Sequence, residues 1–421
     1  MENSNKKKVI IIGAGISGMT AGIYALDNGY DVTIYERHSI VGGQCTGWDR
    51  KGAYIDGCAH WIVGTNPNSD FYPIWRHLGA FDSNTTIFET EYFTKFDIDG
   101  EVVTFYADLE KLEQEFLRVA PEDKRQIRRF INGIKAYKFT KVPTKKPLDH
   151  MNIFEWMVYG IQLLPMAFHF AYYKHTSVKH YAKKFKSPIL KEVFRRFMNG
   201  KYNIHSLVYI MKSLAMRDAG IQVSFKLTKP LFAYPKMVNF AIKPYKLANM
   251  TIDNITIRNH SFDNTLNKSG ATLTVLLHSN DSVYSFLSAL GRKDYLKEKE
   301  KLGLHLLDEI CKYVKLTNED IELIDVSTPL TYERYTNAYH GSYMSFITTR
   351  KSKGLMRKGL IKGLNNFAMA GQWIMSPGGL PIALFSGKFA AIRICKMDNK
   401  KFVDLDYQYT SKYNKNGLRA S

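Results

Sequence analysis

The stretch KVIIIGAGISG, residues 8–18, decides the fold of the N-terminal region. Its β-branched start is typical of a buried strand, and glycines in G-x-G-x-x-G spacing then follow as a helical pattern begins. In such a turn Gly13 permits the tight bend, Gly15 lets the backbone approach a pyrophosphate, and Gly18 allows close packing of helix on strand. The run Val32–Tyr35 predicts a second buried strand, parallel to the first, and so completes one βαβ unit.

Glu36 ends the second predicted strand, 18 residues after Gly18. A carboxylate at this place can accept hydrogen bonds from both ribose hydroxyls of a bound dinucleotide, and it disfavours a 2′-phosphate. NAD and FAD both satisfy this requirement. The motif therefore predicts a dinucleotide site and leaves two cofactors open.

The residues after Glu36-Arg37 narrow the choice of cofactor. VGGQCTGW occupies residues 41–48, and GAYIDGCAHW occupies residues 52–61. Here the sequence resembles the FAD-dependent phytoene desaturase and carotenoid isomerase-like flavoproteins, which are relatives of the amine oxidases and of retinol saturase. In that family the glycine pair, here Gly42-Gly43, lies beside the pyrophosphate. The resemblance favours FAD over NAD.

A second match lies near the end of the chain, where NFAMAGQW (366–373) and PGGLP (377–381) precede Ser386-Gly387. The family closes its FAD site with a strand, here Asn366–Ala370, a glycine-rich turn and a final helix whose N-terminus points at the flavin. Peptide N–H groups there can stabilise negative charge on the isoalloxazine. Many relatives carry Asp in place of Gln372, whose amide can hydrogen-bond a ribityl hydroxyl but adds no charge.

The resemblance thus implies a set of FAD-binding residues drawn from both ends of the chain. They are Gly13, Gly15, Ser17, Gly18, Glu36, Arg37, Gly42, Gly43, Gln44, Gly371, Gln372, Gly379, Leu380 and Pro381. No catalytic triad, H-E-x-x-H motif or other metal-ligand pattern is present. Flavin chemistry needs few protein groups. The titratable candidates for a proton shuttle are His60, Arg334, Tyr335 and His340, and a structural hydrogen-bonding role is the alternative for each.

The fold class predicted from these matches is α/β: a Rossmann-type FAD-binding domain with a parallel sheet, and a second substrate domain of sheet plus helices. The first domain is expected to be discontinuous, at 1–105 and 325–421, with the mainly helical and mixed second domain at 106–324. Helical spacing marks residues 109–119, 127–134 and 302–313, and residues 272–277 predict a strand.

One part of the family pattern is missing. After Arg217-Asp218-Ala219-Gly220 the family has a further glycine-pair turn, a strand and a returning strand, which complete the FAD sheet and one wall of the substrate channel. Here the sequence passes quickly to residues 231–242. The chain is therefore either a shortened variant whose flavin domain closes differently or an impaired descendant.

The charge of the chain favours contact with an anionic surface. Lys and Arg number 59 against 39 Asp and Glu, a formal charge of +20. The densest basic segment, Lys174–Arg196, is interleaved with Tyr172, Tyr173, Tyr181, Phe185 and Phe194. It follows the apolar run Ile153–Tyr173, which carries Glu155, Gln162, Pro165 and His169 and is not predicted to span a membrane.

We expect this region to be a peripheral membrane surface, with a solvated positive face as the alternative, and we expect no nucleic-acid partner because no recognised nucleic-acid module accompanies the charge. Four unpaired-looking cysteines and the lack of a signal peptide predict a cytoplasmic protein on the inner face of the cell membrane.

Three functions remain open from the sequence. The first is hydride transfer between FAD and an apolar carotenoid-like or other isoprenoid lipid, by desaturation, saturation or isomerisation. The second is a non-catalytic flavin or lipid binder, and the third is an amine oxidase-like flavoenzyme. The sequence does not predict the electron acceptor or the oligomeric state.

Overall fold

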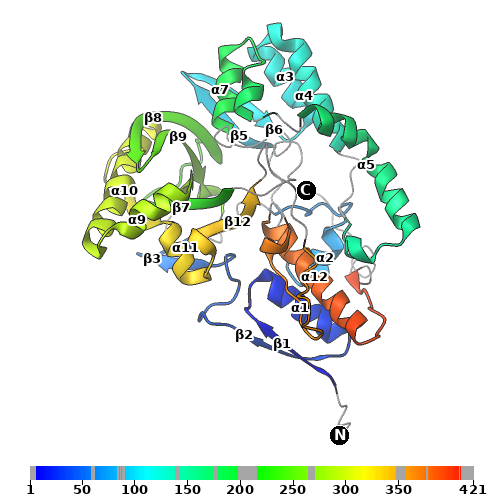
Figure 1. Cartoon of the computed structure of the whole chain (residues 1–421). Helices are drawn as coiled ribbons and strands as arrows, with labels where there is room; N and C mark the ends of the chain where they lie inside the picture. Colours follow the sequence, from blue (N-terminus) through cyan, green and yellow to red (C-terminus); the bar gives the residue numbers. More distant parts are fainter. Residues whose placement is uncertain are drawn as a thin grey trace.

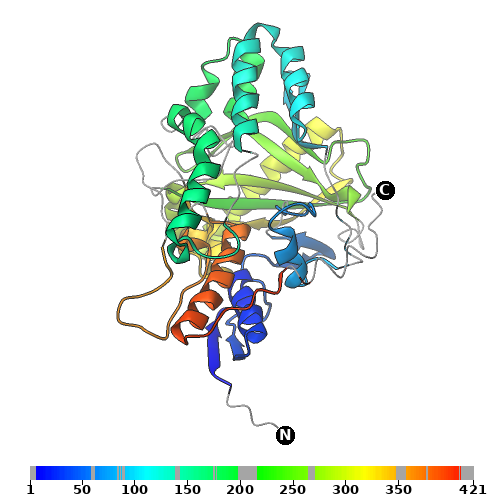
Figure 2. The ribbon, with the colours of Figure 1, turned by 90° about the vertical axis from the view of Figure 1, so that its right-hand side faces the viewer.

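The computed structural model describes most of the chain (Figure 1). The described residues are 6–57, 62–82, 85, 87, 91–137, 143–173, 176, 178–197, 216–263, 271–347, 357–375, 378–406 and 408. Figure 2 shows three parts in succession: the N-terminal unit in blue with the last helix in red, a broad green sheet, and a group of cyan and green helices.

The N-terminal unit is the predicted βαβ arrangement. It consists of β1 (Lys8–Ile12), α1 (Ile16–Asp27) and β2 (Asp31–Tyr35). The strands pair in parallel, with Lys8 opposite Asp31 and Ile12 opposite Tyr35. The final helix α12 (Leu380–Met397) packs on α1, and it does so at close range because a Cβ on Gly387 would overlap the carbonyl oxygen of Ser17.

The two strands are not buried, which corrects the prediction. The side chains of Ile10 and Ile12 are 67% and 91% exposed. Strands of a parallel sheet are normally covered on both faces. In the described part of the chain β1 and β2 form a two-stranded sheet that only α1 covers, so the opposite face stays open.

The prediction of a strand at Asn366–Ala370 is also wrong. This segment has no regular structure, and it does not pair with β1. Its backbone instead bonds to a nearby turn, since the amide of Met369 donates to the carbonyl of Gly359 at 2.6 Å. The segment contains no β-branched residue, so its local preference for a strand is weak.

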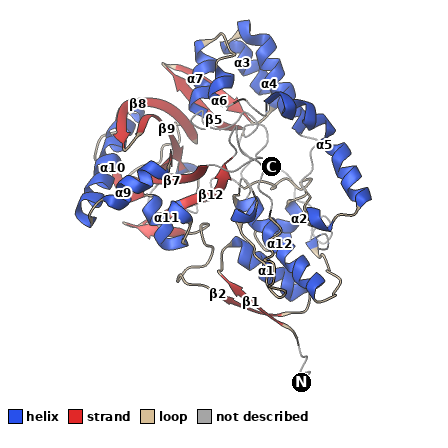
Figure 3. Ribbon diagram, viewed as in Figure 1, coloured by secondary structure: helices blue, strands red, loops and turns tan. Residues whose placement is uncertain are grey.

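A large, mainly antiparallel sheet lies between the N-terminal unit and the group of helices (Figure 2), and its strands are red in Figure 3. Its eight described strands run in the order β11-β7-β10-β9-β8-β5-β6, with β12 beside β7, and β5 pairs β8 in parallel. Their bounds are β5 Tyr92–Ile98, β6 Glu101–Tyr106, β7 Met216–Leu227, β8 Met237–Leu247, β9 Met250–Asn259, β10 Thr272–Ser279, β11 Ile321–Ser327 and β12 Ser342–Ile347. The domain boundaries expected at 105 and 325 cut β6 and β11, so this sheet does not follow them.

Helices cover the sheet and extend beyond it. The helices α9 (Asp281–Ala289) and α10 (Arg292–Val314) pack on one face and close the main apolar core. A second core lies beyond β5 and β6, among α3 (Leu109–Val119), α4 (Lys124–Tyr137), α6 (Val178–Ala182) and α7 (Pro188–Arg196). The helices predicted at 109–119, 127–134 and 302–313 and the strand predicted at 272–277 are confirmed.

Smaller elements complete the description. The strands β3 (Gly47–Arg50) and β4 (Ala53–Asp56) form an antiparallel pair, while α2 (Tyr72–His77) packs on α12 and α11 (Pro329–Thr336) follows β11. The helix α5 (Ile153–Tyr173) stands at the outside of the molecule (Figure 1). None of the described helices is long and apolar enough to cross a membrane.

The aromatic residues of the basic segment do not form a surface. Tyr181, Phe185 and Phe194 are buried in the helical core, where Phe194 lies against Phe116 and Phe130. This corrects the prediction that these rings meet a membrane. The side chains of Tyr172 and Tyr173 are not among those that the structure describes. Exposed apolar residues lie instead on the neighbouring helix α5, as described below.

Candidate functional site

A cavity of about 3310 Å³ lies between the N-terminal unit, the large sheet and the helices. Ligand pockets usually measure roughly 300–1,000 Å³, so this cavity has room for more than one ligand. Three glycine-containing segments line it, at residues 13–18, 42–43 and 371–375 with 378–379, although they lie far apart in the sequence. The fold thus brings together the two ends of the predicted FAD site.

The first two glycine turns touch through their backbones. Gly13 donates its amide to the carbonyl of Tyr35 at 2.7 Å, and Gly42 donates to the carbonyl of Ala14 at 2.8 Å. A Cβ on Gly43 would lie 3.1 Å from the Cα of Gly15. Gly42 and Gly43 have φ angles of 114° and 63°, which disfavour other residues. The glycines of both turns also line the cavity, so their backbone is accessible to a ligand.

The start of α1 has the features that anion binding needs. A Cβ on Gly18 would overlap the carbonyl oxygen of Gly13, so the helix can approach the turn only with glycine there. Gly15 is the N-cap residue, and no side chain bonds to the first amides of the helix. These amides and the helix dipole favour a negative group at this end. Ser17 lines the cavity in the first turn.

Glu36 supports the glycine turn as well as ending β2. Its carboxylate accepts hydrogen bonds from the amide of His38 at 2.9 Å and from the amide of Ala14 at 2.7 Å. These bonds lower the pKa of Glu36, so the group is ionised at neutral pH. The backbone amide of Arg37 also acts on this carboxylate, so only part of its roughly four acceptor positions is left for a ligand. The predicted ribose contact is compatible with this geometry.

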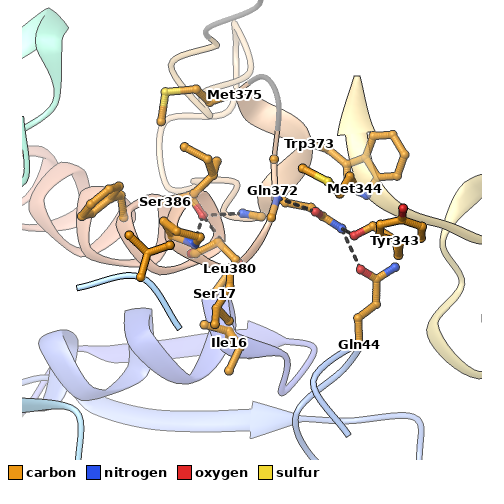
Figure 4. Close-up of a pocket in the computed structure, with 18 of the residues that line it drawn as sticks. Ile16, Ser17, Gln44, Tyr343, Met344, Gln372, Trp373, Met375, Leu380 and Ser386 are labelled. Carbon is orange, nitrogen blue, oxygen red and sulfur yellow. Dashed lines mark hydrogen bonds between the residues drawn. The ribbon is translucent and has the colours of Figure 1, made fainter. Parts of the chain in front are cut away.

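A pair of amide side chains joins the two ends of the site (Figure 4). The Nε2 of Gln372 donates to the Oε1 of Gln44 at 2.8 Å and to the carbonyl of Tyr343 at 3.2 Å. The Oε1 of Gln372 accepts from the amide of Gly379 at 2.8 Å, and Gln44 donates to the carbonyl of Ser342 at 2.8 Å. Both N–H bonds of Gln372 are used inside the protein, so only its oxygen has capacity left for a ribityl hydroxyl.

The start of α12 faces the same cavity. Gly379 is its N-cap residue, with φ of 83°, and no side chain caps the helix. Leu380 and Pro381 form the first turn and line the cavity. The Oγ of Ser386 accepts from the amide of Gly371 at 2.8 Å and so anchors the glycine-rich turn to the helix. The predicted final helix is confirmed, including its start at the turn.

The predicted proton-shuttle residues do not join this arrangement. Arg334 and Tyr335 lie on α11 and are not among the residues that line the cavity. Tyr335 is exposed and its ring contacts His38, while the guanidinium of Arg37 donates to the carbonyl of Arg334 at 3.3 Å. These residues connect α11 to the end of β2. His60 lies outside the described residues.

Tyr343 is a site residue that the sequence reasoning missed. It lies on β12, and its hydroxyl pairs with the Nδ1 of His278 at 2.8 Å while its carbonyl accepts from Gln372. It therefore links the glycine turns to the large sheet. No motif marks it, because its role depends on pairing between β12 and β7. Within the described ranges, no cluster of His, Cys, Asp or Glu could hold a metal ion.

Comparison with known proteins agrees with this fold. Residues 11–78 match a family model described as an NAD(P)-binding Rossmann-like domain. A phytoene desaturase (neurosporene-forming) from Rhodobacter capsulatus is 32% identical over 135 residues, 31% of this chain and 25% of that protein. Polyamine oxidase 5 from Oryza sativa is 29% identical over 134 residues, 29% of this chain and 27% of that protein. The chain thus matches only about a quarter of the length of these curated relatives.

Two solved structures are similar over almost the whole chain. An engineered putrescine oxidase superposes with a TM-score of 0.51 at 12% identity, covering 94% of this chain and 100% of that one. Cyclohexylamine oxidase from Brevibacterium oxydans gives 0.51 at 13% identity, with the same coverage. At this identity the likeness concerns the fold. About a third of the chain is thus similar in sequence to carotenoid desaturases and to an amine oxidase, and residues 11–78 match a Rossmann-like NAD(P)-binding domain. Over almost its whole length the chain shares its fold with two amine oxidases, which agrees with the resemblance in its sequence.

Proposed function

We propose that the protein is an FAD-dependent oxidoreductase that transfers a hydride between flavin and an apolar, carotenoid-like or other isoprenoid lipid. The observation that carries this proposal is the meeting of three glycine segments at one cavity. The contact of Gly43 with Gly15 supports FAD over NAD, because it extends the phosphate-binding turn with a second glycine turn. The low-identity match to carotenoid desaturases supports the substrate class.

The described residues fit a bound FAD. The open amides at the start of α1 and the backbone of Gly15 and Gly43 would hold the pyrophosphate, and Glu36 would bind the ribose. The amides at the start of α12 would lie toward the isoalloxazine and favour negative charge on it. The flavin would supply the hydride chemistry, while this chain would orient it and exclude water.

Apolar side chains support a lipid substrate. Phe93, Phe96, Phe105, Phe130 and Phe197 line the part of the cavity near the helices. Large cavities with mainly aromatic and aliphatic walls are typical sites for apolar ligands. A long polyene has few polar groups, so such walls would bind it by burying its surface.

The substitution Gly15→Ala tests the flavin proposal. An added Cβ would lie 3.8 Å from the Cα of Gly43, an ordinary contact, so the protein should fold normally. The methyl group would nevertheless occupy the space beside the expected pyrophosphate. Gly160→Ala, on the outer helix α5 with no neighbour within 4 Å, is the matched control.

Absorption spectra after incubation with FAD, followed by extraction and mass analysis, provide the measurement. Wild type and Gly160→Ala should retain flavin, and Gly15→Ala should lose most of it. A wild-type protein that stays colourless would falsify the proposal. For the substrate, we expect an isoprenoid polyene to bleach the flavin under anaerobic conditions. If no lipid tested bleaches the flavin, the proposed hydride transfer is refuted.

We also propose that α5 attaches the protein to a membrane surface. Ile153, Phe154, Met157 and Ile161 are between 59% and 80% exposed. Single exposed apolar residues are common, but a series of them on one helix marks an interaction surface. Trp156 of the same helix lines the cavity, so a lipid could enter from this side.

The exposed basic residues of the neighbouring segment favour a membrane surface with negative charge. Lys183, Lys184, Lys186 and Lys191 are exposed. In vesicle sedimentation, the protein should bind phosphatidylglycerol vesicles more strongly than phosphatidylcholine vesicles. Ile161→Asp should weaken binding to both, and Leu296→Asp, an exposed apolar position on α10, should not. Equal binding by the two variants would refute the role of α5.

Two other functions are supported by particular observations. The open edge of β1 favours a non-catalytic flavin or lipid binder, which would hold flavin that no substrate reduces. The similarity to polyamine oxidase 5 favours an amine oxidase. Release of peroxide with simple amines under air would support the latter, and its absence together with flavin bleaching by a lipid would support the main proposal.

A further inference from the structure

The two faces of the large sheet differ in chemistry. The face toward α9 and α10 is apolar, and its buried side chains include Val238, Phe240, Ile255, Ile257 and Val275. The opposite face borders the cavity, and the cavity-lining residues on it include Asn239, Asn254, Thr256, Arg258 and His278. A site for a pure hydrocarbon has no use for such a polar face. The cavity therefore has an apolar part, near the helices, and a polar part.

Arg258 is the charged residue in the middle of this polar face. It lies on β9 opposite Met237 of β8 and Thr274 of β10. It is half-buried, and burial lowers its pKa to about 10 although Tyr343 and Asp56 attract its charge. A guanidinium that has lost water gains free energy when an anion binds to it.

The polar groups next to Arg258 are ordered by bonds to one another. The Nδ2 of Asn239 donates to the Oδ1 of Asn254 and to the Oγ1 of Thr256, both at 3.0 Å. The Oγ1 of Thr274 pairs with the Nε2 of His260 at 3.0 Å. These bonds fix the orientation of uncharged amides and hydroxyls around the guanidinium. The result is a preorganised polar surface with a cation at its centre.

This polar surface adjoins the glycine turns through Tyr343. The hydroxyl of Tyr343 pairs with His278 on the polar face, and its carbonyl accepts from Gln372 at the junction of the turns. Met237, Leu276 and Met344 line the cavity in the same region and give it apolar walls. One ligand can therefore place a polar head at Arg258 and still extend along apolar walls within the cavity that holds the glycine turns.

We propose that the substrate is a long-chain carboxylic acid, aliphatic or isoprenoid, whose carboxylate binds Arg258 on the polar face of the large sheet. The planar fork of a guanidinium matches a carboxylate with two parallel hydrogen bonds. This inference rests on the proposed function, because it names the class of lipid that the flavoenzyme would use. It adds an acidic end to the apolar lipid of that proposal.

Binding of oleate and of oleyl alcohol to the purified full-length protein tests this assignment. The two probes share a chain and differ in the head group, and intrinsic tryptophan fluorescence reports binding without turnover. Wild type should prefer oleate by at least about 10-fold, the contribution of one charge-assisted hydrogen bond. Arg258→Gln should reduce this preference to about 1. Arg128→Gln, which removes the same charge from an exposed position on α4, should keep it.

Equal affinity of wild type for the two probes would overturn the proposal, and so would a preference retained in Arg258→Gln. If Arg258→Gln does not fold, Arg258→Lys keeps the charge and loses the fork, so its preference should fall several-fold, and an unchanged preference would again contradict the assignment. The binding test needs no flavin chemistry. Failure to bind FAD would refute the proposed function, whereas a wild-type protein without a head-group preference would refute only the proposal that the substrate carries a carboxylate.

Discussion

The Gln44–Gln372 pair makes a definite prediction for the substitution Gln372→Glu. The new side chain has the same shape, and one oxygen can still accept from the amide of Gly379. The other oxygen replaces an amide nitrogen that donates to Gln44 at 2.8 Å and to the carbonyl of Tyr343 at 3.2 Å. A carboxylate oxygen cannot donate, so it would face two acceptors.

The size of the effect follows from these contacts. Two lost hydrogen bonds of about 1 kcal/mol each, together with repulsion between the oxygens, should lower the free energy of unfolding by about 2–4 kcal/mol at pH 7. The same contacts should raise the pKa of the introduced carboxyl above about 4.3. A protonated carboxyl can donate again. The loss should therefore shrink as the pH falls through the folded-state pKa, and it should be smallest below the unfolded-state pKa.

Urea unfolding followed by tryptophan fluorescence, at pH 7 and at pH 4, measures this effect. Gln162→Glu, the same substitution at an exposed position of α5, is the control and should change stability by less than about 0.5 kcal/mol. If the amide of Gln44 rotates, it can donate to the new carboxylate but gives up its bond to Ser342. A loss below about 1 kcal/mol at pH 7, or one that grows toward low pH, would refute the role given to Gln372.

Two further predictions concern the packing of α1. Gly387→Ala should lower the free energy of unfolding by about 1–3 kcal/mol, because its methyl group would overlap the carbonyl of Ser17, and an unchanged urea midpoint would contradict this close contact. Burial lowers the pKa of His77, but its bonds to Asp406 and Asp27, both at 2.7 Å, outweigh burial and raise it. Its protonation therefore stabilises the fold fully below about pH 6.5 and less as the pH rises through the folded-state pKa, so His77→Gln should cost more at pH 6 than at pH 9, and equal costs would exclude this charge effect.

The local part of the site could be predicted from the sequence, because its geometry depends on neighbouring residues. The β-branched run before Gly13, the glycine spacing and Glu36 together specify a strand, a turn and a helix. The structure adds the reason for Gly18, whose Cβ would overlap the turn. Helices marked by apolar spacing were predictable for the same reason.

The parts that failed depend on contacts between distant segments. An apolar strand is buried only if another element covers it, and nothing in the run Val9–Ile12 shows that its outer face lacks cover. Aromatic residues look alike in a core and at a membrane surface, so Phe194 could be placed only once α7 was seen to pack on α3 and α4. The roles of Tyr343 and Arg258 depend on strand order, which no motif records.

The incomplete parallel sheet leaves the glycine site intact, because the contacts that hold the site do not cross the open edge of β1. The turn at Gly13 is bound to Tyr35 of β2, and the turn at Gly42 is bound to Ala14. Gln372 then ties Gln44 to the start of α12. Each contact lies on the side of α1, α12 or β12, so an element covering Ile10 and Ile12 on the open face would add no support for the turns. A chain that lacks such cover can therefore lose stability at β1 and still keep the backbone geometry that a dinucleotide requires.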